Sequence, residues 1–139
     1  MAAKDASAAF NREKMAAGII AAGSSTGVAN TLCGGATTTI PASKTSIKGS
    51  KYQSTQTEWD FETQYWGWQC LKFSMAEPQY YMYSYTAASS AGAAGDKFEV
   101  KAQGDLDGDD SLSSFSLEGE IRDSAIAVSP TIAETNPEE

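Results

Sequence analysis

Strict alternation of apolar and polar side chains in the second half of the chain is the feature that most limits its fold. In residues 97–102 (KFEVKA), Phe98, Val100 and Ala102 fall on one side and three charged residues on the other. This two-residue period is that of a β-strand with one buried face. Alternation of the same kind predicts further strands over 66–74, 79–87, 113–123 and 125–128. Sequential strands joined by short connections favour an antiparallel meander.

The apolar face of such a sheet needs a cover, and the N-terminal segment is the expected one. Residues 3–22 (AKDASAAFNREKMAAGIIAA) are rich in helix formers, and Gly23 stands where a helix would end. We therefore expect an α+β fold, with an N-terminal helix packed on a four- to five-stranded antiparallel meander. The 139 residues form one domain, divided into a truncated helix (1–22), a helix-to-sheet connection (23–65), and the sheet with a C-terminal tail (66–139).

Composition excludes several functional classes. The chain has no histidine, which rules out Ser-His and Cys-His nucleophile pairs and imidazole zinc sites. Ten Lys and Arg against 18 Asp and Glu give a net charge of −8, which is unfavourable for binding the phosphate backbone of nucleic acids. We expect neither an enzyme nor a nucleic-acid-binding protein.

The negative charge is concentrated at one end of the chain. Residues 96–139 carry three basic and twelve acidic side chains, a balance of −9, whereas residues 1–95 carry seven and six, a balance of +1. Unlike ends favour head-to-tail association of subunits. Acidic loops that keep an exported protein soluble are the alternative interpretation.

Two cysteines, Cys33 and Cys70, are too few for a disulfide scaffold and do not form a CxxC motif. In an oxidising compartment we expect them to form one disulfide. Two buried thiols are the alternative.

The acidic segment 104–111 (GDLDGDDS) is the most specific local motif. Asp105, Asp107 and Asp109 alternate as in the first half of a calcium loop, with the Ser111 carbonyl as a further oxygen ligand. The second half of such a loop does not match, because Asp110 stands where glycine is usual and Ser116 where a bidentate Glu is usual. Calcium is therefore the one cofactor that the sequence suggests, and an exposed hairpin turn at Asp107-Gly108 is the alternative.

Aromatic residues are crowded between positions 52 and 85 and include Trp59, Trp66 and Trp68. Such residues form a sheet core, stack sugars or make subunit contacts. We expect Leu71, Phe73 and one face of the tyrosine-rich strand to be core, and the sequence does not decide the role of the tryptophans. Acidic residues alternate among these aromatics, a spacing too weak to predict a glycosidase acid pair.

The order of these segments resembles the soluble head of a type IV pilin or pseudopilin. The segment KFEVKAQGDLDGDDSLSSFSLEGEI, followed by SPTIAETNPEE, is similar to the end of deltaproteobacterial pilins, and WGWQCLKFS with PQYYMYSY resembles their paired central strands. The prepilin cleavage-site glycine and the long apolar segment after it are not in this sequence, so we expect the chain to begin inside a longer first helix.

The resemblance implies a structural subunit of an extracellular type IV pilus that serves adhesion or surface motility. Its partners would be other pilin subunits in a helical filament, and the inner membrane through the N-terminal helix of the precursor. The alternatives are a pseudopilin of a type II secretion system and a secreted calcium-dependent or carbohydrate-binding module. The resemblance implies no catalytic residue.

Overall fold

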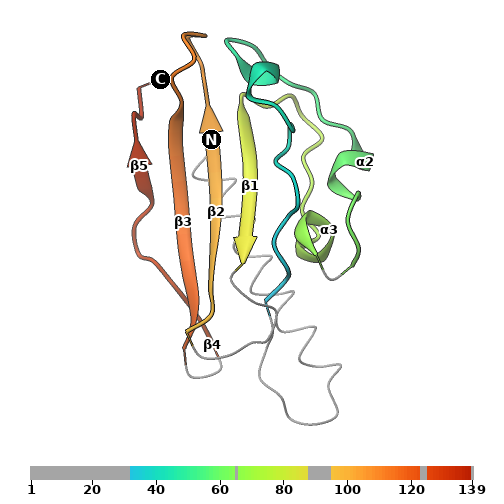
Figure 1. Ribbon diagram of the computed structural model, residues 1–139, viewed down its shortest axis with the longest axis vertical. Coiled ribbons are helices and arrows are strands. Elements are labelled where there is room, and N and C mark those ends of the chain that lie inside the picture. Colours follow the sequence, from blue (N-terminus) through green and yellow to red (C-terminus); the bar gives the residue numbers. More distant parts are fainter. Residues whose placement is uncertain (1–31, 65, 88–94, 123–124, 139) are drawn as a thin grey trace.

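The main element of the protein is one antiparallel β-sheet, shown by the computed structural model (Figure 1). The structure describes residues 32–64, 66–87, 95–122 and 125–138. The strands are β1 (Tyr81–Ala87), β2 (Lys97–Gly104), β3 (Ser113–Arg122), β4 (Ala125–Val128) and β5 (Ala133–Thr135). Their order is β1-β2-β3-β4, and β5 also pairs with β3.

The expected α+β fold, a long helix packed on the sheet, is wrong for the described part of the chain. That part is mostly sheet, and its helices are short: a 3-10 helix η1 (Lys44–Ile47), α2 (Gln56–Trp59) and α3 (Gly67–Leu71). The helix expected over 3–22 lies outside the described residues. Among the helices that are described, none is long and apolar enough to cross a bilayer.

The strand expected over 66–74 is also wrong, because its centre forms α3. Gly67, Trp68, Cys70 and Leu71 are all buried. Gly67 and Leu71 are four residues apart and Trp68 and Leu71 three, a spacing that belongs to a helix and not to a strand. Lys72, with φ of 53°, adopts the left-handed conformation that ends the helix. A short apolar segment can form a helix or a strand. Which of the two it forms depends on its tertiary contacts, and here the segment is helical.

The other expected strands are present. Residues 81–87 of the tyrosine-rich segment form β1, 97–104 form β2, 113–122 form β3, and 125–128 form β4. The alternation in 97–102 predicted that Phe98, Val100 and Ala102 face inward, and all three are buried. The sequence left open which face of the tyrosine-rich strand is core, and Tyr83 and Tyr85 are the buried residues. The three-residue strand β5 was not expected, because AET (133–135) is short and stands at the start of a polar chain end without alternation.

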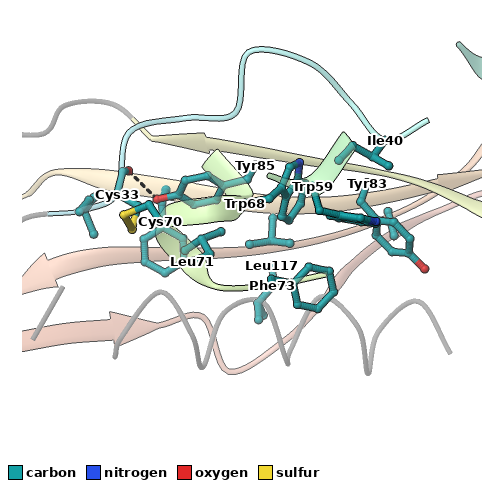
Figure 2. Close-up of a cluster of buried hydrophobic side chains, with 14 of the residues drawn as sticks. Cys33, Ile40, Trp59, Trp68, Cys70, Leu71, Phe73, Tyr83, Tyr85 and Leu117 are labelled. Atoms are coloured by element: carbon teal, nitrogen blue, oxygen red, sulfur yellow. Dashed lines mark hydrogen bonds between the residues drawn. A yellow bond between two sulfur atoms is a disulfide. The ribbon is translucent and has the colours of Figure 1, made fainter. Parts of the chain in front are cut away.

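The core lies on one face of the sheet and continues into α2 and α3 (Figure 2). Trp59 of α2 and Trp68 of α3 meet edge to face, with ring centroids 5.3 Å apart, and Phe73 lies 5.4 Å from Trp59. The opposite sheet face is polar and includes the Lys101–Glu99 ion pair on β2. The protein thus has one apolar and one wet sheet face, as is usual for antiparallel sheets.

The outer edges of β1 and β3 are both paired with further backbone. The free edge of β1 is bonded by an irregular segment, where Ala36 N donates to Tyr85 O at 2.9 Å and Ile40 pairs with Tyr83 in both directions. Figure 1 shows this segment running beside β1. The outer edge of β3 pairs with β5 over Ser114–Ser116 and with β4 over Gly119–Arg122, and Ser129 N donates to Glu118 O between them.

Candidate functional site

The acidic turn, residues 105–111, joins β2 to β3 and lies beside η1 at one end of the sheet (Figure 1). Asp105 is buried, with 2% of its surface exposed, although it is a carboxylate. Asp107 and Asp109 are exposed. Burial of an ionisable side chain needs compensation, and the turn supplies it through its own backbone.

Backbone N–H groups of the turn donate to its carboxylates. Asp105 Oδ1 accepts from Gly108 N at 2.8 Å and Asp105 Oδ2 from Asp110 N at 3.1 Å. Asp109 N donates to Asp107 Oδ1 at 3.1 Å, and Ser111 N donates to Asp109 Oδ1 at 2.7 Å. Asp side chains that accept from N–H groups a few residues ahead stabilise tight turns, and these hydrogen bonds hold the acidic turn closed.

The turn is also fastened to the segment that follows η1. Gly49 N donates to Asp105 O at 2.8 Å, and Lys48 Nζ forms a hydrogen-bonded ion pair with Asp110. The hydrogen bond from Lys48 lowers the pKa of Asp110, and the nearby positive charges add to this effect. The hydrogen bond to Asp110 raises the pKa of Lys48 in turn, and the charges of Asp110, Asp105 and Asp109 raise it further.

The structure brings the three predicted ligand residues together. One carboxylate oxygen from each of Asp105, Asp107 and Asp109 lies within 4.8 Å of the other two. Oxygen ligands in this number suit a hard cation such as Ca²⁺, with water completing the shell. The fourth predicted ligand residue, Ser111, enters the turn through its N–H, which donates to Asp109. Calcium binding at the acidic turn therefore stays a prediction.

The disulfide site lies at the other side of the core. Cys33 and Cys70 are joined by a disulfide with a Cα–Cα distance of 5.8 Å, and this bond ties the segment around residue 33, before η1, to α3. Both residues are buried, and Tyr85 donates its hydroxyl to Cys33 O at 2.8 Å (Figure 2). The disulfide and the hydrogen bond from Tyr85 together join the segment around Cys33, α3 and strand β1 at one point.

The aromatic residues divide between core and surface. Trp59 and Trp68 are buried, with 1% and 2% of their surface exposed, and the indole N–H of Trp59 donates to Ser54 Oγ at 2.9 Å. Trp66, at 49%, and Phe61, at 74%, are exposed. The role that the sequence left undecided is therefore core for two of the tryptophans and surface for the third.

The acids among these aromatics take part in local hydrogen bonds. Glu58 closes a capping box on α2, where it accepts from Thr55, and it also accepts from the hydroxyl of Tyr52. The hydrogen bond between Tyr52 and Glu58 raises the pKa of Tyr52 above its ordinary value. Glu62 accepts from Thr37 N, and Asp60 accepts from Gln56 Nε2 at 2.9 Å. Each of the three carboxylates therefore has a local structural role.

No known relative was found. Comparison with known proteins found no matching family model, no similar curated protein and no similar solved structure. The resemblance to pilins therefore stays an interpretation of the sequence.

Two hollows on the surface were not expected from the sequence. One, of about 310 Å³, lies over β3 and β4, where Glu120 is paired with Arg122. The other, of about 410 Å³, is lined by residues of α2, of α3 and of the segment after α3, including Trp68 and Phe73. The residues that line this second hollow all lie within 56–74. In the sequence this segment shows polar side chains among aromatic ones, a pattern that does not predict a hollow.

Proposed function

We propose that the chain is the head of a structural subunit, a pilin, of an extracellular type IV pilus filament that serves adhesion or surface motility. Its partners are other copies of the subunit in the filament. The full-length precursor enters the inner membrane through an N-terminal helix before assembly. No catalytic residue takes part in this function.

The disulfide is the observation that supports export. Disulfides persist in oxidising surroundings outside the cytosol, and Cys33–Cys70 is buried in the core. A subunit that stands on the cell surface gains from such a bond, because the bond limits unfolding where no chaperone acts.

The segment that resembles pilins supports the assignment to this class. Residues 97–122 form the hairpin of β2 and β3, the acidic turn at its tip is fastened to Lys48, and β5 of the tail returns to pair with β3. The resemblance therefore rests on a continuous structural unit and not on scattered residues.

Deletion of the gene in its host tests the proposal. We expect surface filaments seen by electron microscopy to disappear and to return when the full-length gene is restored. Filaments that persist, together with free monomeric protein in the medium, would overturn it. Loss of secreted enzymes with filaments intact would assign the chain to a type II secretion pseudopilus.

A further inference from the structure

The hollow of about 410 Å³ is lined by aromatic and polar side chains. The aromatic ones, Trp68 and Phe73, are buried, whereas the polar ones are exposed or half-buried. The polar lining residues are Gln56, Asp60, Gln64, Gln69, Lys72 and Ser74. The hollow is therefore apolar on its inner side and polar toward solvent, which suits a small molecule with both apolar and polar parts.

The two charged residues of the hollow have opposite charges that are not paired. Among the described residues, neither Asp60 nor Lys72 takes part in an ion pair, and the ion pairs that are present involve other side chains. Asp60 accepts a hydrogen bond from Gln56 Nε2 at 2.9 Å, and this neutral donor leaves the negative charge in place. The hollow thus offers a carboxylate and an ammonium group to a ligand at the same time.

The other charges in this part of the chain do not change that balance. Glu58 and Glu62 are the remaining charged residues between Lys51 and Lys72, and neither lines the hollow. Their carboxylates accept from Thr55 N and Thr37 N. A ligand in the hollow therefore meets one positive and one negative side chain, which disfavours a ligand with charge of only one sign.

Trp68 adds a hydrogen-bond donor without a partner. Its buried Nε1–H has no acceptor among the described residues, whereas the indole N–H of Trp59 donates to Ser54 Oγ. A buried polar group without a partner is unfavourable, and an acceptor brought into the hollow by a ligand or by water removes that cost.

We propose that this hollow binds a small ω-amino acid, a zwitterion whose ammonium and carboxylate groups are separated by methylene groups. The ammonium pairs with Asp60 and the carboxylate with Lys72. The methylene groups lie against Trp68 and Phe73, where they leave water for aromatic surface. This inference goes beyond the filament function and does not depend on it, because the lining comes from residues 56–74 of a single copy of the chain.

Titration of the ¹⁵N-labelled chain with 6-aminohexanoate at pH 7, followed by NMR, tests the proposal. We expect the indole N–H signal of Trp68 to shift saturably, with a Kd on the order of 1 mM for so small a ligand. The signal of Trp66, which is exposed and does not line the hollow, should stay in place.

Singly charged analogues test the need for both charges. Hexanoate and hexylamine each keep the apolar chain and one charge, and we expect both to bind at least about 5-fold more weakly than 6-aminohexanoate. Absence of a saturable shift up to about 10 mM 6-aminohexanoate, or equal binding of a singly charged analogue, overturns the proposal.

Charge-removing variants locate each end of the ligand. Asp60→Asn should bind 6-aminohexanoate no better than hexanoate, and Lys72→Gln should bind it no better than hexylamine, because each variant removes one pairing. Both side chains are exposed, so we expect unchanged melting curves. Asp107→Asn in the acidic turn and Lys51→Gln beside Tyr80 remove the same charges outside the hollow and are the matched controls. An equal loss of affinity in these controls would assign the effect to overall charge and overturn the site.

Discussion

Asp105 is a buried carboxylate whose two oxygens hold the acidic turn together. We predict that Asp105→Ala lowers the free energy of unfolding by about 1–3 kcal/mol, because it leaves two N–H groups without their acceptor. Urea denaturation measures the change. The control is Asp109→Ala, an exposed residue of the same turn, which we expect to cost less than about 1 kcal/mol. Equal effects would show that burial of Asp105 is not what secures the turn.

The Lys48–Asp110 pair makes stability depend on pH at both extremes. The pKa of Asp110 is lowered in the folded chain, so its contribution is complete above the unfolded value, near pH 4, and is lost as the pH falls through the folded value. The pKa of Lys48 is raised, so its contribution is complete below the unfolded value and is lost as the pH rises through the folded one.

We predict that Asp110→Asn flattens the pH dependence of the melting temperature at both extremes. The effect is small because both side chains are exposed. Asp107→Asn removes the same charge without breaking this pair and serves as the control. A wild-type profile that matches that of Asp110→Asn would contradict the role of the pair.

Single residues also show what sequence alone could predict at the candidate site. Asp105, Asp107 and Asp109 lie close in sequence, so their proximity followed from spacing. Lys48 is 62 residues from Asp110 and was not predicted to contact it, because only the bridge between Lys48 and Asp105, just after β2, brings them together. Phe61 and Trp66 were singled out only as part of an aromatic group, since exposure depends on tertiary packing.

Among the elements, the disulfide-linked pair of segments carries a clear stability prediction. Cys33 and Cys70 are 37 residues apart, and closing a loop of this length lowers the conformational entropy of the unfolded chain. We predict that Cys33→Ser with Cys70→Ser lowers the free energy of unfolding by about 3–4 kcal/mol. Guanidinium denaturation of the double variant measures it. Mass measurement with and without alkylation checks that the wild type carries no free thiol.

The β2–β3 hairpin carries the calcium prediction. Calcium at the acidic turn would relieve repulsion among its carboxylates and stiffen the hairpin, so millimolar calcium should raise the melting temperature more than magnesium does. Because the shell would contain much water, the affinity is expected to be weak, about 10⁻⁴ to 10⁻³ M. Asp107→Asn with Asp109→Asn keeps the turn and removes two charges. If wild type and double variant respond alike to calcium, the segment is a turn only.

The success of prediction differed between elements for a physical reason. Strands β2 and β3 were predictable because each has one solvent-facing and one buried face, so polar and apolar residues alternate along their sequences. The segment of α3 is buried on several sides and fastened by a disulfide, so its apolar residues carried no reliable period. The cover of the sheet could not be predicted from 32–80, because irregular backbone and short helices have weak sequence patterns.

For the whole molecule, we predict a monomer in dilute solution. The large apolar residues exposed on the described part of the chain are few, and apart from Phe61 and Trp66 in the loop between α2 and α3 they lie in separate segments: Phe61, Trp66, Tyr80, Leu106 and Val128. A stable complex needs roughly 1,000 Å² or more of buried surface. Light scattering measures the mass. A stable dimer at micromolar concentration would show an interface that these residues do not supply.

The covered sides of the sheet have a consequence for crowded surroundings. A bare strand edge invites a neighbouring chain to add its own strand, which is the first step toward amyloid-like aggregation. Here one side of the sheet is bonded by the segment before η1, and the other ends in two short strands, β4 and β5, separated along β3. Within the described residues, the long strands β1 and β3 therefore have paired outer edges, and the backbone beyond β3 belongs to the short strands β4 and β5. Copies held side by side thus present only short or irregular edges to which a neighbouring chain could add a strand.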